Sequence, residues 1–213
     1  MIAYKLADAA LLARASYDPE GIIKPAVSDT LDHNDVQAVL LENGTLVLPG
    51  SNSLNDYLKF NLRIFNVGHK QYRFDDGPTE KGASQTWWHQ GFLSYSRIVF
   101  DWVGDRKPKF IIGHSLGAAA TQILSKSWSV PAIGFAAPRP KKTANRVVDD
   151  EKCLSICRTD DLVTSLPSGF SHMGKAILIS TQSAGIFPHA MPHYVSLLEK
   201  AKDVAGVPKR WPL

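Results

Sequence analysis

A serine lies between two glycines at Gly113–Gly117, which reads Gly-His-Ser-Leu-Gly. The apolar run before it, Lys109–Ile112, is typical of a short buried strand, and Ser115–Lys126 predicts a helix that begins with small residues. A serine in a sharp strand-to-helix turn projects its hydroxyl above the sheet edge, and the turn tolerates no bulk at its flanks, which explains both glycines. The helix N-terminus favours developing negative charge, and the backbone N–H of Leu116 can bind an oxyanion. The pattern predicts that Ser115 is a nucleophile, with an idle serine in a glycine turn as the alternative.

A nucleophilic serine on such a turn takes its acid and its base from later in the chain, in the order serine, acid, histidine. The apolar segment Cys153–Cys157 predicts a strand, and two carboxylates, Asp160 and Asp161, follow it. Either residue could be the acid of a catalytic triad. The alternative is that both are ordinary turn carboxylates.

Chain order also restricts the choice of base. Four of the seven histidines precede the acid and are set aside: His33, His69, His89 and His114. His114 adjoins the serine and is expected to pack beside it. Of the rest, His172 comes before the strand expected at Ala176–Ser180, which is too early. His189 lies in the loop after that strand, whereas His193 follows Pro192 in the first turn of the last helix. Both remain candidates, because an imidazole with a pKa near 6.5 can accept a serine proton at neutral pH.

The elements expected around these residues alternate between strands and helices. The first residues, 1–15, predict an amphipathic helix, followed by a Pro- and Gly-rich loop at 17–35. Asn43-Gly44 predicts a hairpin between the strands Val36–Leu41 and Thr45–Leu48. The further expected elements are a short helix or flap at 54–60, a strand at 63–67, a surface loop at 73–85, a helix from His89 to Trp102, a strand at 132–136 and a last helix from Pro192. This order predicts an α/β fold with a mainly parallel sheet flanked by helices.

Size and composition describe an ordinary globular chain. It has 213 residues, of which 44% are hydrophobic and 21% charged, so we expect one domain spanning residues 1–213. The net charge of +4 comes from scattered basic residues, so we expect no nucleic-acid partner. Cys153 and Cys157 are spaced to lie on one face of a strand, too far apart to bridge.

We expect neither the first residues nor the apolar runs to be targeting or membrane segments. Lys5, Asp8 and Arg14 interrupt any signal-peptide core, so the default expectation is a cytoplasmic protein. No apolar run is long enough to cross a membrane, and we expect no transmembrane segment. There is no His-Glu-x-x-His motif and no zinc-like cysteine and histidine spacing, so we expect neither a metal nor a cofactor.

Five ordered blocks of the sequence resemble the class 3 lipase family of α/β-hydrolases, which includes the fungal triacylglycerol lipases. The likeness covers about residues 1–200. The blocks match, in order, the family's oxyanion strand and lid, its His-x-Gly-Phe motif, its nucleophile turn, the end of the next strand and its acid loop: Leu46–Leu58, His89–Phe92, Ile111–Ala119, Gly134–Arg139 and Asp161–Pro167. Any one block is weak, but five in the right order are specific. Two positions depart from the family, Pro49 where it has arginine and Thr164 where it has proline.

The resemblance implies an α/β-hydrolase fold with a small lid-like segment. It also implies a catalytic triad in this chain. It favours Asp161 over Asp160 as the acid and His189 over His193 as the base. It also implies that Ser51 is an oxyanion-hole residue together with Leu116. The lid would lie at 52–60, where Leu54, Tyr57, Leu58 and Phe60 either face an acyl chain or a lipid surface, or pack on the core.

The expected activity is that of a serine carboxylic ester hydrolase, a lipase or esterase that cleaves acylglycerol or other fatty acyl esters through an acyl-enzyme. Its expected partners are an ester or lipid substrate and, transiently, a lipid interface. Two alternatives stay open. One is a phospholipase or polar-ester hydrolase on the same triad, and the other is a non-catalytic binding protein with a lipase fold.

Overall fold

The computed structural model describes residues 2–22, 24–33, 35–50, 64–73, 77–180, 187–200 and 206–213. Its α-helices are α1 (Leu6–Ala15), α3 (Gln90–Val103), α4 (Ser115–Trp128) and α5 (Met191–Lys200). The strands of the main sheet are β2 (Val27–His33), β3 (Val36–Leu41), β4 (Thr45–Leu48), β9 (Phe110–His114), β10 (Ala132–Phe135), β11 (Cys153–Arg158) and β12 (Lys175–Ile179). Three short pairs complete the described strands: β1 (Tyr4–Lys5) with β13 (Arg210–Trp211), β5 (Ile64–Val67) with β6 (Lys70–Arg73), and β7 (Thr79–Lys81) with β8 (Trp87–His89).

The main sheet has seven strands in the order β12-β11-β10-β9-β4-β3-β2. Strands β12, β11, β10, β9 and β4 run parallel, and β3 and β2 continue the sheet antiparallel. The carboxyl ends of the parallel strands therefore meet at one edge, where β9 leads directly into α4. This is the mainly parallel sheet that the alternation of elements predicts.

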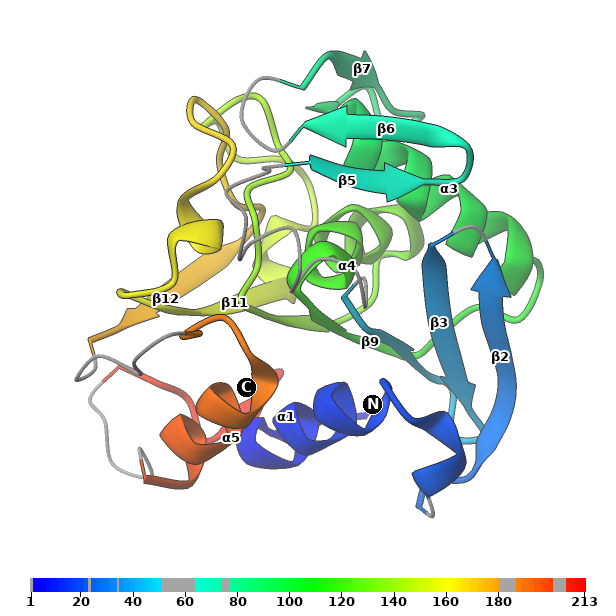
Figure 1. The fold of residues 1–213 in the computed structure, drawn as a ribbon, viewed down its shortest axis with the longest axis vertical. Helices are drawn as coiled ribbons and strands as arrows, with labels where there is room; N and C mark the ends of the chain where they lie inside the picture. The colour runs from blue at the N-terminus through cyan, green and yellow to red at the C-terminus, as the bar shows by residue number, and fades with distance from the viewer. Residues whose placement is uncertain are drawn as a thin grey trace.

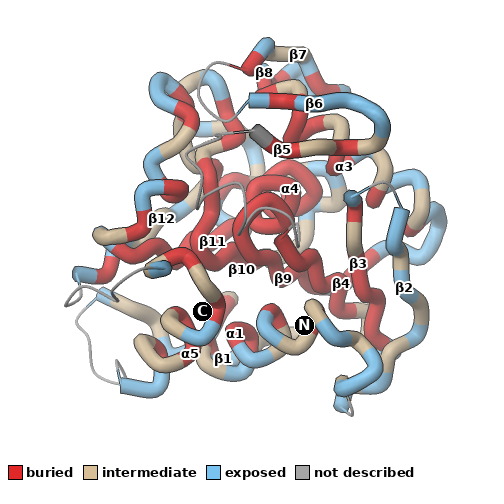
Figure 2. Tube along the Cα trace, in the orientation of Figure 1, coloured by how far each residue is buried: buried red, intermediate tan, exposed pale blue. Residues whose placement is uncertain are grey.

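Helices cover both faces of the sheet (Figure 1), with α3 and α4 on one face and α1 and α5 on the other. Each face has its own apolar core. Figure 2 shows that α4 and the central strands are buried, while β2 and the outer helix surfaces are exposed. The small residues at the start of α4 allow it to lie close to the sheet, since a Cβ on Gly134 of β10 would lie 3.1 Å from Cβ of Ala118.

Four local predictions differ from the structure. The expected helix at 1–15 begins only at Leu6, because Tyr4–Lys5 form β1, which pairs with β13. The expected loop at 17–35 contains β2, whose alternating half-buried and exposed residues belong to an edge strand with a polar outer face. The expected surface loop at 73–85 contains β7, paired with β8. His89 ends β8, and α3 begins one residue later, at Gln90.

The predicted hairpin between β3 and β4 is present, with a loop longer than the Asn43-Gly44 pair. Strand β3 ends at Leu41 and β4 begins at Thr45, and the N–H of Gly44 donates to the carbonyl oxygen of Leu41 at 2.9 Å. Gly44 has a φ of 84°, the left-handed conformation that closes three-residue hairpin loops.

The chain begins and ends on the α1 and α5 face, where β1 and β13 pair antiparallel. Cys153 and Cys157 are buried free thiols, as their spacing predicts. Within the described residues, no helix combines the length and the apolar character that crossing a membrane requires. The expected flap at 54–60 and lid at 52–60 lie outside the described residues.

Candidate active site

The turn from β9 into α4 forces Ser115 into an unusual backbone conformation. Ser115 has a φ of 55°, which costs an L-residue about 1–2 kcal/mol and holds it at the sheet edge. The flanking glycines are required by close contacts. A Cβ on Gly113 would lie 2.2 Å from Oγ1 of Thr121, and a Cβ on Gly117 would lie 2.2 Å from the carbonyl oxygen of Leu48. The turn therefore tolerates the serine only with glycine on both sides.

His189 contacts the Ser115 hydroxyl from the loop before α5. Its Nε2 lies 2.7 Å from Oγ of Ser115, which is hydrogen-bond distance. Its Nδ1 lies 3.0 Å and 2.8 Å from the two carboxylate oxygens of Asp161. The structure thus places Ser115, His189 and Asp161 in one hydrogen-bonded row, and all three are buried.

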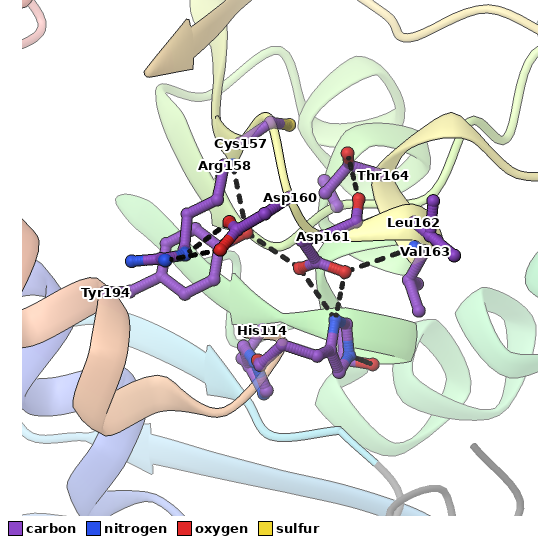
Figure 3. A network of polar contacts seen from close by, with 12 residues as sticks. His114, Cys157, Arg158, Asp160, Asp161, Leu162, Val163, Thr164 and Tyr194 are labelled. Carbon is purple, nitrogen blue, oxygen red and sulfur yellow. Dashed lines mark hydrogen bonds and ion pairs between the residues drawn. The ribbon is translucent and has the colours of Figure 1, made fainter. Parts of the chain in front are cut away.

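Asp161 lies at the start of the short 3-10 helix Leu162–Ser165, just after β11. Figure 3 shows its carboxylate between Tyr194 and Val163. The Tyr194 hydroxyl donates to Oδ2 at 2.8 Å, and the Val163 N–H donates to Oδ1 at 3.1 Å. Burial acts to raise the pKa of Asp161, but the nearby His189 and these hydrogen bonds outweigh it and hold the pKa below its usual value. The carboxylate is therefore ionised at neutral pH.

The two alternative candidates have other surroundings. Asp160 pairs through both carboxylate oxygens with the Arg158 guanidinium, at 3.0 Å and 2.8 Å. His193 lies in the first turn of α5, where its backbone N–H donates to the carbonyl oxygen of Ala190 at 3.0 Å. His189 is the histidine that contacts Ser115.

The other side of Ser115 is formed by the carboxyl end of β4 and by His114. A Cβ on Gly50 would lie 2.9 Å from Cβ of Ser115, so this backbone passes directly beside the serine. Leu116 is the second residue of α4, where the N–H has no partner within the helix. Its N–H is therefore suited to bind an oxyanion. Ser51, the other expected oxyanion residue, lies outside the described residues.

The His114 side chain is buried between two segments that flank the serine. Its Nε2 lies 2.9 Å from the carbonyl oxygen of His189, and its Nδ1 lies 2.5 Å from the Tyr17 hydroxyl. Burial and the nearby His189 lower the pKa of His114 to about 3, so the ring is neutral at physiological pH. His114 packs beside the serine, as expected.

The two departures from the family pattern make ordinary contacts. The Thr164 hydroxyl donates to the Asp161 carbonyl oxygen at 2.8 Å and closes the turn after the acid. The Pro49 carbonyl oxygen packs against Gly117 and lies 3.4 Å from the Tyr95 hydroxyl, which can donate to it. Neither side chain takes part in the hydrogen bonds that join Ser115, His189 and Asp161.

Two tyrosines of the site were missed by the interpretation of the sequence. Tyr194 falls in the expected last helix from Pro192 and Tyr17 at the start of the expected loop at 17–35, and neither was assigned a role in the site. No local pattern could have found Tyr17, because its partner His114 lies 97 residues away in the chain.

Comparison with known proteins supports the fold. No protein-family model matches the sequence, and no curated protein matches it significantly. Lipase II from Rhizopus niveus is similar in structure, with a TM-score of 0.61 and 15% identity over 84% of this chain and 81% of that one. Lip2 lipase from Yarrowia lipolytica has a TM-score of 0.55 and 18% identity, over 82% of this chain and 77% of that one. Rhizomucor miehei lipase has a TM-score of 0.55 and 16% identity, over 82% of this chain and 67% of that one. The chain has the α/β-hydrolase fold of these lipases, which confirms the fold that the sequence predicts.

Proposed function

We propose that this chain is a serine carboxylic ester hydrolase that cleaves fatty acyl esters. One observation carries the proposal: Ser115, at a positive φ on the strand-to-helix turn, lies 2.7 Å from His189, which in turn lies 2.8 Å from Asp161. A serine hydroxyl is a weak nucleophile unless a base within hydrogen-bond reach takes its proton, and the base needs a third group to orient it. The three residues supply these roles in the chain order of α/β-hydrolases.

In the first half of the reaction, Oγ of Ser115 attacks the ester carbonyl carbon while Nε2 of His189 takes the hydroxyl proton. The carbonyl oxygen becomes an oxyanion, which the Leu116 N–H and the positive end of α4 stabilise. We assign Ser51 as the second oxyanion donor. Asp161 accepts a hydrogen bond from Nδ1–H of His189 and stabilises the imidazolium without taking its proton.

In the second half, Nε2–H of His189 gives its proton to the alkoxide oxygen as the bond to the acyl carbon breaks. The alcohol leaves and the acyl group stays on Ser115. A water molecule then attacks the acyl-enzyme while His189 accepts its proton. When this second oxyanion collapses, the bond from the acyl carbon to Oγ breaks and His189 gives the proton to Oγ, which restores the Ser115 hydroxyl. The cycle consumes one ester and one water, and yields one alcohol and one carboxylic acid.

Apolar side chains beside the triad support an acyl substrate. Leu162 follows Asp161 directly and is 78% exposed, and Phe187 lies two residues before His189 and is 40% exposed. Large exposed apolar residues that lie close in sequence to two members of the triad are suited to contact an acyl chain or the surface of a lipid aggregate.

The test is hydrolysis of a chain-length series of p-nitrophenyl esters by the wild type, Ser115→Ala and Ser125→Ala. Ser125 is a matched control because it is buried on the same helix, where its hydroxyl donates to the Val130 carbonyl oxygen. We expect Ser115→Ala to lower turnover by about 10⁶-fold without unfolding the protein, and Ser125→Ala to stay within about threefold of the wild type. A wild type that binds these esters without turnover would identify a binding protein, and a loss below tenfold in Ser115→Ala would refute the nucleophile.

A further inference from the structure

A chain of hydrogen bonds links the two sides of the serine site without touching Ser115. It runs from the backbone N–H of Gly50 to the Tyr17 hydroxyl at 2.8 Å, from that hydroxyl to Nδ1 of His114 at 2.5 Å, and from Nε2 of His114 to the carbonyl oxygen of His189 at 2.9 Å. Gly50 belongs to the oxyanion side, and His189 is the proposed base. We propose that Tyr17 and His114 form a brace that fixes the position of His189 relative to the oxyanion side, and so sets the rate of the chemical step. The proposal rests on the proposed function.

The direction of each hydrogen bond in the brace follows from the atoms involved. The Gly50 N–H can only donate, so the Tyr17 oxygen accepts it. The His189 carbonyl can only accept, so Nε2 of His114 carries the proton. A neutral His114 then has a lone pair on Nδ1, which accepts the Tyr17 O–H. Only this arrangement gives every donor and acceptor of the brace a partner, so the brace has no second hydrogen-bonding state.

The brace must be neutral to serve the proposed reaction. The rings of His114 and His189 have centroids 5.1 Å apart, and His189 becomes an imidazolium when it takes the serine proton. A second positive charge at this distance would oppose that step. The pKa of His114, lowered to about 3 by burial and by His189, keeps the ring uncharged at neutral pH. Burial also raises the pKa of Tyr17, so its hydroxyl keeps its proton.

The space around Gly50 shows why its position needs support. A Cβ on this residue would lie 2.7 Å from the Tyr17 hydroxyl oxygen and 2.9 Å from Cβ of Ser115, so Tyr17, Gly50 and Ser115 are packed in contact. The Gly50 N–H is used by Tyr17, so this N–H positions the strand end and is not an oxyanion donor. A shift of the strand end would change the gap beside Ser115, where a reacting carbonyl has to fit. Such misplacement lowers turnover even when substrate binding is retained.

Strand β4 offers a matched control at its other end. There the Tyr4 hydroxyl lies 2.7 Å from Oγ1 of Thr45 and accepts a hydrogen bond from the Asn43 side chain at 2.9 Å. Tyr4→Phe and Tyr17→Phe each remove one tyrosine hydroxyl that bonds to the β4 region, but only Tyr17 is close to the serine.

The experiment compares kcat, KM and melting temperature of both variants with a soluble p-nitrophenyl ester. We expect Tyr17→Phe to lower kcat by about tenfold with KM within about twofold, because two buried groups lose their partner and the strand end can shift. Tyr4→Phe should lower the melting temperature to a similar extent and leave kcat within about twofold. A kcat in Tyr17→Phe equal to that of Tyr4→Phe would overturn the brace.

His114→Gln is a second test of the brace, and it does not depend on whether the Tyr17→Phe variant folds. Glutamine can keep the donor to the His189 carbonyl but lacks the ring nitrogen that faces Tyr17, so it should lower kcat by a similar factor. In the double variant the two losses should not multiply, because either change cuts the same chain. Independent, multiplying losses, or an unchanged kcat in His114→Gln, would overturn the brace. An inactive wild type would overturn the proposed function, and the catalytic role of the brace with it.

Discussion

The two sides of Ser115 are supported by different kinds of hydrogen bond. On the base side, His189 lies against an ionised carboxylate that also accepts from Tyr194 and from the Val163 backbone. On the oxyanion side, Gly50 is held by Tyr17 and His114, which are both neutral. Gly50 and His114 are buried, as are Asp161 and His189, so the difference does not come from exposure to solvent.

This difference follows from the charges that the proposed reaction creates. A cation develops on His189, and a fixed anion beside it lowers the barrier. An anion develops on the substrate oxygen, where neutral donors and a helix N-terminus can stabilise it. A positive charge on His114 would act mainly on its neighbour His189 and oppose its protonation. Removing the Asp161 anion or the His189 base should therefore cost much more activity than removing one neutral hydrogen-bond partner on either side.

The largest expected effect separates the two candidate bases. His189→Ala removes the group that accepts the Ser115 proton, and turnover should fall by about 10⁶-fold. His193→Ala changes a half-buried side chain in the first turn of α5 and should leave turnover within about threefold of the wild type. Steady-state kinetics on a soluble ester measures both. If His193→Ala gave the large loss, the contact between His189 and Ser115 would not be the catalytic one.

The second effect tests the charge on the base side. Asp161→Asn keeps the shape of the side chain but removes the anion and can hold His189 in the wrong tautomer, so kcat should fall by about 10⁴-fold. Asp160→Asn is the matched control, because its carboxylate pairs with Arg158. We expect that variant to lose some stability and keep kcat within about fivefold of the wild type. Equal losses in the two variants would contradict the assignment of Asp161.

A smaller loss is expected when only the support of the acid is removed. Tyr194→Phe deletes the hydroxyl that donates to Asp161 and leaves the ring packed in the core, so kcat should fall by about tenfold, as expected for a hydrogen bond to a charged group. Tyr72→Phe removes a part-buried hydroxyl that lies 3.1 Å from Oγ of Ser94 and takes no part in the network around Asp161, so it should leave kcat unchanged. A loss below twofold in Tyr194→Phe would show that His189 and Val163 orient Asp161 without it.

The pH dependence of the free energy of unfolding tests whether His114 is uncharged in the folded protein. His114 has a pKa of about 3 in the fold and near 6.5 when unfolded, so below pH 6.5 the unfolded chain binds a proton that the folded chain does not. The free energy of unfolding should therefore fall as pH drops from 6.5, by up to about 1.4 kcal/mol per pH unit from this residue. His89, with a pKa lowered to about 4 by burial, adds a loss of the same sign.

Urea unfolding between pH 5 and 7 measures this slope. His114→Gln should flatten it by close to one proton, whereas Ser125→Ala, which removes no titratable group, should leave it unchanged. An unaltered slope in His114→Gln would mean that His114 is not held neutral by the fold.

Short-range patterns in the sequence predict much of this fold. The β9 strand, the turn at Ser115 and helix α4 follow from an apolar run, two glycines and a helical period, and the structure confirms them. Strand β2 was missed because an edge strand with one polar face has the composition of a loop. The physical reason is that its burial is set by β3, which the local sequence does not reveal.

The site itself could be predicted only in part. Chain order and the family resemblance lead to Asp161 and His189, and the structure brings both to Ser115. The supporting tyrosines could not be predicted from periodicity, because their roles depend on contacts across 33 residues for Tyr194 with Asp161 and 97 residues for Tyr17 with His114. Such contacts exist only once the sheet and its two helical layers have formed.

The central claim is that Ser115 is a nucleophile made reactive by His189. A fluorophosphonate probe tests it directly, because it forms a stable covalent adduct only with an activated serine. Intact mass and peptide mapping should show one adduct per chain, on Ser115, in the wild type, and none in Ser115→Ala or His189→Ala. An unlabelled wild type, or an adduct that forms at the same rate in His189→Ala, would contradict the account.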